Sequence, residues 1–307
     1  MKIKEKREYL LKKLLEKEKI VTQYDNVYKE LQGPGLWLKI KRLFLQRNYV
    51  QYCLGRMGIL KEGQTKLFWG KKITLPLADG SNFCLYFSGT LSKEEFKLTK
   101  FFIRNLKEDD IFYDIGANYG FYSLLANEII SKGEIHIFEP SSKIFSYLRK
   151  NLSQNKTKKI FLNNRAILDK NKIYPFFELI YSVGSTIFES VAKTYKIYYQ
   201  ETKIKAITLD SYTKQHNFPT FIKLDIEGGE KDALVGASEM LEKCSPIIAM
   251  EVWGGKKGEK FSRQAVNLLH KIGYHSYAID EQGEIKPQER IHFKQIKEDF
   301  ENLIFKR

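Results

Sequence analysis

The chain has 307 residues, of which 43% are hydrophobic, and it carries a formal net charge of +15 at pH 7. The apolar content is sufficient for a real core, but no apolar run approaches the ~20 residues of a membrane-spanning helix, which excludes a helical integral membrane protein. The positive charge favours an anionic partner such as nucleic acid, a phospholipid surface or a phosphate-bearing glycan.

The first 65 residues hold much of this charge, with 15 Lys and Arg against 7 Asp and Glu, a net +8. From Leu10 to Leu31 apolar residues recur at spacings of three and four, which predicts a helix with one apolar stripe, interrupted only by Lys17. A Gly-Pro-Gly sequence at 33–35 is expected to end this helix. Charges break up the leucines of the segment, so it does not resemble a signal peptide.

A second basic, amphipathic segment follows at 36–57, "LWLKIKRLFLQRNYVQYCLGRM". Two interpretations are open: a helix that docks its apolar face on the main domain, or a helix that lies on an anionic membrane surface. We favour docking, because apolar stripes at helical spacing usually pack into a core. The sequence therefore predicts a basic helical N-terminal extension over 1–65 and a main domain over 66–307.

Residues 66–90 are expected to form strands around a turn at 78–82, and 91–107 a helix with a capping-box spacing of Ser92 and Glu95. From 108 to 255, the core of the main domain, strand-like and helix-like segments alternate, which predicts a doubly wound, mostly parallel sheet. The strands are "DIFYDIG", "EIHIFEP", "KIFLNNRAI", "TFIKLDIEG" and "PIIAMEVW", with helical patterns at 119–131, 143–154 and 230–241.

Residues 169–209 fit neither period cleanly, so we expect a substrate-specific insertion or hairpin there rather than another helix on the sheet. Beyond 255 the pattern predicts a helix at 262–273, a strand pair around 278–285 and a final strand at 302–307.

The segment "YDIGANYGFYSLLA", residues 113–126, joins the first core strand to a helix through a turn with two glycines. Gly116 lets the backbone bend and Gly120 lets a ligand or the next helix come close, because neither has a Cβ. Asp114 closes the first strand and Glu139 the second, at the edge where doubly wound sheets bind ligands. A carboxylate in the position of Glu139 accepts hydrogen bonds from both hydroxyls of a ribose. The expected cofactor-binding residues are Asp114, Gly116, Ala117, Asn118, Gly120, Glu139, Pro140 and Asp225.

Electrostatics decides which nucleoside this pocket suits. Dinucleotide sites use a G-x-G-x-x-G turn whose amides meet a pyrophosphate, whereas here the two glycines stand four apart and follow an aspartate. Asp114 disfavours a diphosphate and favours an ammonium group. S-adenosylmethionine carries an ammonium, a carboxylate, a ribose and an adenine but no phosphate, so the pattern favours this cofactor over NAD.

Six motifs, "DIGANYGFYSL", "IFEPS", "NRAIL", "TLDSY", "FIKLDIEGGEKDALVGA" and "AMEVW", resemble in order and spacing the FkbM family of S-adenosylmethionine-dependent methyltransferases. The resemblance covers residues 68–307 and not the first 65. It implies an α/β, Rossmann-like class I methyltransferase fold, with a seven-stranded, mostly parallel sheet and an antiparallel last strand. It also implies O-methylation, often of sugar or polyketide hydroxyls.

The fourth core strand ends in "KLDIEGGE", which brings Asp225, Glu227 and Glu230 within six residues at the ligand-binding edge. Repulsion among them is expected to raise the pKa of at least one carboxyl group, which suits a general base that removes a proton from an acceptor hydroxyl. We assign Asp225 and Glu227 to catalysis. The alternative is that Glu230 only stabilises the first helical turn and Glu227 is a solvated loop residue.

Glu251 and Trp253 end the neighbouring strand, and together with Glu230 they are the expected substrate-contacting residues. Asp225 and Glu251 could share a Mg²⁺, but carboxylates at strand ends need no metal, and we expect none. Trp253 either stacks on a sugar or covers the edge of the sheet. None of the five histidines shows the spacing of metal ligands, and none is assigned to catalysis.

Two further functions stay open beside methylation of a saccharide, glycolipid or related hydroxyl. A nucleic-acid methyltransferase would explain the basic charge, but the fourth strand lacks the [DN]-P-P-[FY] motif and the charge lies mostly outside the core, so no nucleic acid is expected. A non-catalytic binding module that retains the fold is the other. Three scattered cysteines, Cys53, Cys84 and Cys244, indicate reduced thiols and a cytoplasmic protein, which residues 1–65 could bring to the inner face of a membrane.

Overall fold

The computed structural model describes residues 2–30, 47–155, 157, 159–288, 290–296 and 300–307. The chain divides into two compact units, Met1–Phe96 and Lys97–Arg307. Within the described residues, β1 (Glu62–Lys66) and β2 (Lys72–Pro76) pair with each other and belong to the first unit, while the boundary between an extension over 1–65 and a main domain over 66–307 stays a prediction.

The first unit is built on the helix α1 (Ile3–Glu30), in which Leu10, Leu14 and Val21 are buried. The predicted helix is therefore confirmed, and so is its apolar stripe as far as Val21, while Leu31 lies outside the described residues. The described end of the second basic segment is α3 (Arg47–Arg56), whose Tyr52 lies edge-on against Phe83 of the next helix. This part docks within its own unit, while residues 31–46, with the Gly-Pro-Gly sequence and the start of that segment, lie outside the described residues.

The expectation of strands over 66–90 is wrong in its second half, which forms the helix α4 (Phe83–Ser88). A short apolar run does not distinguish a strand from a helix, and signals at both ends decide the matter. Asp79 caps the 3-10 turn that leads into α4 by accepting a hydrogen bond from the Ser81 amide at 3.0 Å, and Gly89 ends the helix in a left-handed conformation with φ +73°. A short 3-10 turn then leads into α5 (Phe96–Asn105), and Ser92 caps that turn without a side-chain hydrogen bond among the described residues.

The second unit contains one large sheet, in which the described residues form eight strands in the order β12-β11-β13-β10-β9-β3-β4-β5. The five strands β10, β9, β3, β4 and β5 run parallel to one another, whereas β13 is antiparallel to both β10 and β11. This confirms the predicted α/β sheet with an antiparallel last strand, to which β12 adds a short edge. The strands are β3 (Ile111–Ile115), β4 (Glu134–Phe138), β5 (Ile160–Asn163), β9 (Phe221–Leu224), β10 (Ile247–Trp253), β11 (His275–Ile279), β12 (Ile285–Pro287) and β13 (Phe300–Lys306).

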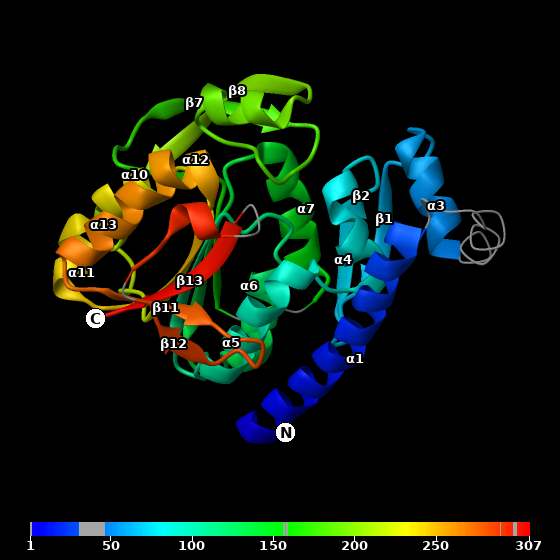
Figure 1. Ribbon diagram of the computed structural model, residues 1–307, viewed down its shortest axis with the longest axis horizontal. Coiled ribbons are helices and arrows are strands. Elements are labelled where there is room, and N and C mark those ends of the chain that lie inside the picture. The colour runs from blue at the N-terminus through cyan, green and yellow to red at the C-terminus, as the bar shows by residue number, and fades with distance from the viewer. Residues whose placement is uncertain (1, 31–46, 156, 158, 289, 297–299) are drawn as a thin grey trace. The chain divides into compact units, whose positions relative to one another are not determined.

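Helices cover both faces of this sheet (Figure 1). One layer contains α5, α6 (Phe121–Ile129) and α7 (Ser142–Ser153), and the other contains α10 (Glu230–Val235), α11 (Ser238–Lys243) and α13 (Arg263–Lys271). The helix predicted over 230–241 is broken between α10 and α11 at Gly236 and Ala237, and Gly236 passes so close to the Leu168 carbonyl oxygen that a Cβ would lie 2.1 Å from it. Among the described residues no helix is both long and apolar enough to cross a membrane.

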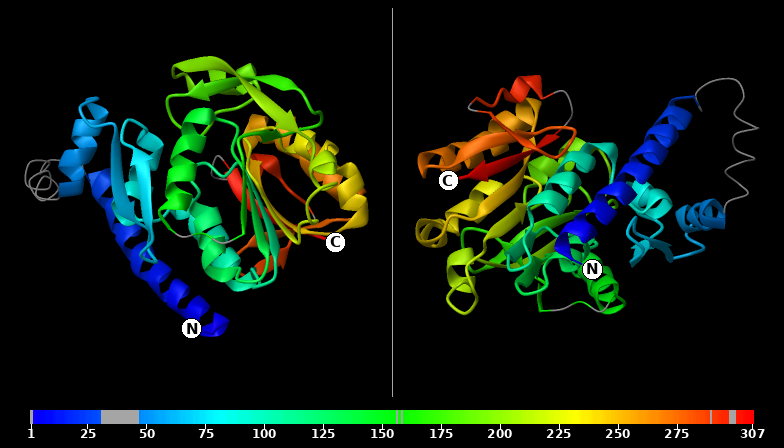
Figure 2. Two further views of the ribbon diagram at one scale, coloured as in Figure 1. Left: turned by 180° about the vertical axis from the view of Figure 1, so that it is seen from behind. Right: turned by 90° about the horizontal axis from the view of Figure 1, so that it is seen from below.

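Residues 169–209 form the predicted hairpin, β7 (Ile173–Leu179) and β8 (Tyr199–Ile207), with the short helix α8 (Glu189–Ala192) between them. The strand predicted over 159–167 splits, since β6 (Ala166–Ile167) leaves the large sheet and pairs with β8. Thr208 caps α9 (Leu209–Tyr212), which returns the chain to the large sheet. The hairpin is thus a separate small sheet joined to the main one (Figure 2).

Candidate active site

The turn between β3 and α6 follows a path that only glycine tolerates at two positions. Gly116 has φ +82°, and a Cβ there would lie 1.9 Å from the carbonyl oxygen of Asp225, so this turn lies directly against the end of β9. Gly120 has φ +91°, and a Cβ there would lie 2.6 Å from the Leu148 side chain of α7. Gly116 therefore permits contact between two strand ends, and Gly120 permits the approach of the next helix.

Glu139 follows β4 and ties the turn to the second strand. One carboxylate oxygen accepts the Asn118 amide and the other accepts the Ser141 amide, both at 2.9 Å. Burial raises the pKa of Glu139 to about 7. Each carboxylate oxygen has a second lone pair, so Glu139 could accept ribose hydroxyls while it holds the turn. Of the other predicted residues here, Ala117 is buried and Pro140 is partly buried.

Asp114 is fully buried at the end of β3. Its Oδ2 accepts the Ser123 hydroxyl at 2.5 Å, whereas its Oδ1 has no hydrogen-bond partner among the described residues. Burial raises the pKa of Asp114, and the positive charge of Lys223 opposes that rise. A buried carboxylate oxygen without a partner is costly. The group that best satisfies it is a cationic donor, so the site fits a ligand with an ammonium group.

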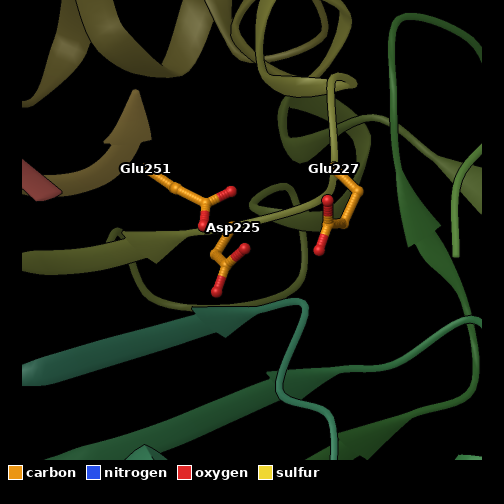
Figure 3. A group of neighbouring side chains, drawn as sticks. All are labelled: Asp225, Glu227 and Glu251. Atoms are coloured by element: carbon orange, nitrogen blue, oxygen red, sulfur yellow. The ribbon is translucent and has the colours of Figure 1, made fainter. Parts of the chain in front are cut away.

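Three carboxylates gather at the ends of β9 and β10. Oxygen atoms of Asp225, Glu227 and Glu251 all lie within 4.8 Å of one another, and Figure 3 shows the three groups facing a common space. Asp225 follows β9, Glu251 belongs to β10, and Glu227 lies in the intervening loop with a left-handed φ of +54°. Three oxygens at this separation are within reach of one divalent cation, although a lysine already offsets part of their charge.

That lysine is Lys223, which the sequence reasoning did not select. Its side chain is buried in β9, and its Nζ lies 2.7 Å from Oδ2 of Asp225. It also faces the ring of Tyr122, with 5.2 Å between Nζ and the ring centroid. A signal was present, because a lysine in the middle of a strand that is buried on both faces is unusual and needs a partner nearby.

Glu227 connects this site to the hairpin. Its carboxylate accepts the Gly184 amide at 2.7 Å and the Tyr195 hydroxyl at 3.2 Å, and its carbonyl oxygen accepts the Thr186 hydroxyl at 2.7 Å. Burial, followed by the nearby charge of Asp225, raises the pKa of Glu227 to about 7. Glu227 is therefore a bonded residue rather than a solvated one, and the region 180–198 forms part of the site wall.

Glu230 has a different environment, although it is close in sequence. It is 3% exposed, and one of its carboxylate oxygens accepts the amides of Ile226 at 3.1 Å and Gly228 at 3.3 Å. Burial raises the pKa of Glu230 to about 7. These bonds hold the loop that carries Glu227 at the start of α10, whereas a contact between Glu230 and a substrate stays a prediction.

Trp253 is buried at the end of β10, and its indole N–H donates to Glu251 at 2.8 Å. The ammonium group of Lys257, in α12 (Gly255–Lys257), lies 5.2 Å from the Trp253 ring and 4.2 Å from the Tyr195 ring. Because so little of its surface is exposed, the indole is better placed to cover the edge of the sheet than to stack on a sugar.

Comparison with known proteins identifies a family. A family model described as the methyltransferase FkbM domain matches residues 114–276, and a search of curated proteins found no match. The solved structure of FkbM methyltransferase from Methylobacillus flagellatus is similar with 16% identity and a TM-score of 0.43, over 66% of this chain and 44% of that one. This chain thus spans less than half the length of that protein.

Two other solved structures are similar at comparable levels. Fibrillarin from Aeropyrum pernix, with natively bound S-adenosyl-L-methionine, has 12% identity and a TM-score of 0.42, over 70% of this chain and 76% of that one. A SAM-dependent O-methyltransferase from Thermotoga maritima has 11% identity and a TM-score of 0.42, over 80% and 77%.

Proposed function

The chain belongs to the FkbM family of methyltransferases, and we propose on that premise that it methylates a hydroxyl group of a saccharide, a glycolipid or a related natural product. Its second unit is a methyltransferase domain with S-adenosylmethionine as cofactor. When bound, the cofactor supplies a methyl group on a cationic sulfur. The chain has to align the acceptor with that group and remove the acceptor's proton.

The observation that carries the proposal is the Glu227 carboxylate in the loop after β9. A pKa of about 7 keeps this group partly deprotonated at neutral pH, where it can accept a proton from a hydroxyl. Asp225 lies beside it with a side chain that is 32% exposed, so an acceptor can reach it. We assign Asp225 to hold the acceptor hydroxyl and Glu227 to receive its proton, with Lys223 fixing the position of Asp225.

The same cluster supports an acceptor rich in hydroxyl groups. The carboxylates of Asp225, Glu227 and Glu251 together offer many acceptor lone pairs, which match the donors of a sugar. Three carboxylates in one place repel phosphodiesters, so a nucleic acid is disfavoured as the acceptor even though the chain is basic overall.

For the partner of residues 1–65 we propose an anionic membrane surface at the cytoplasmic side. Val50, Met57 and Ile59 are exposed in or next to α3, and Arg56 is exposed between them. Apolar side chains flanked by cations suit insertion at the surface of an anionic bilayer. Sedimentation with phosphatidylglycerol liposomes at low salt tests this partner, and a Val50→Ser/Met57→Ser variant that sediments as well as the wild type would contradict it.

Methyl transfer is tested with S-adenosylmethionine and a panel of sugars, glycolipids and oligonucleotides, with products identified by mass spectrometry. We expect a mass gain of one methyl group on hydroxyl-bearing acceptors, and turnover reduced about a hundredfold or more in Asp225→Asn and Glu227→Gln. Glu239→Gln, which removes an exposed carboxylate from α11, serves as the control. Cofactor binding without transfer to any hydroxyl contradicts the acceptor class, and a lack of cofactor binding favours a non-catalytic module.

A further inference from the structure

The first unit contains an open hollow of about 410 Å³ that is lined by residues of α1, the β1–β2 hairpin and α4. This volume is in the range of small-molecule sites. The hollow is mostly polar, and among the described residues that line it none is acidic. The polar side chains around it are those of Lys17, Gln64, Thr65, Lys66, Lys72 and Ser88.

Lys17 occupies a position where the pattern of α1 calls for an apolar residue. Its neighbours in the stripe, Leu14 and Val21, are both buried, so a leucine at position 17 would continue the packed face. The structure instead holds an ammonium group on this face, at the wall of the hollow. A partly buried cation at a packing position lowers stability unless an anion compensates it.

Lys66 and Lys72 bring two further positive charges to the wall of the same hollow. They are directly opposite one another in the antiparallel pairing of β1 with β2, and both are exposed. Like charges in directly opposed positions of a sheet are destabilising. Within the described part of the chain, no carboxylate lies at ion-pair distance from Lys17 or Lys66. Three cations from three elements therefore face one small volume.

We propose that this hollow binds the phosphate group of a ligand other than the methyl donor. A phosphate monoester or a diphosphate carries about two or more negative charges and several acceptor oxygens, whereas a carboxylate neutralises only one lysine. Lysine ammonium groups bind phosphate as point charges and adapt to its position. The site does not rest on methyl transfer, because all of its residues belong to the first unit.

The first test is calorimetric titration of the full chain with pyrophosphate at low ionic strength. We expect saturable binding by the wild type. The affinity for pyrophosphate is expected to fall by a factor of about ten or more in Lys66→Gln/Lys72→Gln and in Lys17→Leu. Lys17→Leu completes the apolar stripe, so we also expect its melting temperature to rise, which separates loss of binding from loss of folding. Lys61→Gln/Lys93→Gln removes the same charge from exposed positions outside the hollow and is the matched control.

A second arm distinguishes a lipid headgroup from a soluble phosphate. Phosphatidylcholine vesicles with and without phosphatidic acid are sedimented with the same variants. If the wild type sediments with phosphatidic acid and the hollow variants do not, the phosphate belongs to a lipid. If the hollow variants lose only pyrophosphate binding, the phosphate belongs to a soluble ligand. The proposal is overturned if neither is seen, or if the control pair loses as much binding as the hollow variants. Titration with S-adenosylmethionine in the same variants reports on the methyltransferase unit, so the two proposals can fail separately.

Discussion

Glu230→Gln is a sharp test of how the loop after β9 is held. In the folded protein this carboxyl group is buried and accepts two backbone amides of its own loop. Burial moves its pKa from 4.5 to about 7. Glutamine has the same shape and keeps a carbonyl oxygen for the Ile226 and Gly228 amides, but it has no charge to bury.

The sign and size of the effect follow from the two pKa values. A carboxyl group with a raised pKa in the folded state contributes stability that is fully present below pH 4.5 and is lost as pH rises through 7. The difference between the two values corresponds to about 3 kcal/mol of unfolding free energy. We therefore expect Glu230→Gln to match the wild type at pH 4.5 and to be more stable by up to about 3 kcal/mol at pH 8.5.

Urea unfolding followed by circular dichroism, at intervals from pH 4.5 to 8.5, measures this difference. Glu139 and Glu227 also have pKa values of about 7, so the wild-type profile contains several contributions and only the difference between variant and wild type isolates Glu230. Glu239→Gln controls for the loss of an exposed carboxylate. A difference in stability that is the same at both ends of the pH range would refute the reasoning, because Glu230 would then not titrate between them.

Three other substitutions test the rest of the site, and Gly255→Ala serves as the comparison for the first of them. Gly116→Ala is expected to lower the unfolding free energy by about 2–4 kcal/mol, since a Cβ would clash with the Asp225 carbonyl at a φ of +82°. Gly255→Ala, at a φ of +57° with open space around it, should cost only about 1 kcal/mol in the same urea unfolding measurement. Lys223→Met removes the buried cation beside Asp225 and Asp114, and we expect a loss of about 3 kcal/mol at pH 8. The loss should shrink steadily as the pH is lowered, because burial raises the pKa of Asp114 and its protonation relieves the uncompensated charge. A loss that does not change with pH would show that the lysine acts through packing alone. Glu139→Ala removes the acceptor of the Asn118 and Ser141 amides. Calorimetry should find that its affinity for S-adenosylmethionine is lower by a factor of about ten or more. Unchanged affinity would exclude Glu139 from the cofactor site.

The local sequence pattern predicted an element correctly where its hydrophobic periodicity and the residues at its two ends indicated the same structure. The alternation from 108 to 255 predicted the parallel strands, and it placed Asp225 and Glu251 on adjacent strand ends because parallel strands finish at one edge of a sheet. Where the pattern was ambiguous it failed. The apolar run at 83–88 formed a helix rather than a strand, and Gly236 divided a helix that periodicity alone would continue.

The amino-acid sequence by itself determined the succession of parallel strands along the chain, the glycine turn after β3 and the carboxylates of Asp225 and Glu251 at β9 and β10, because these depend on residues close together in the chain. Only the tertiary structure decided that Glu227 is fastened to Gly184, 43 positions away, and that Lys66 stands opposite Lys72. Such pairings depend on how a hairpin folds back and in which register its strands meet. Local propensity does not specify the partner across that distance, so burial and charge at the site emerged only with the fold.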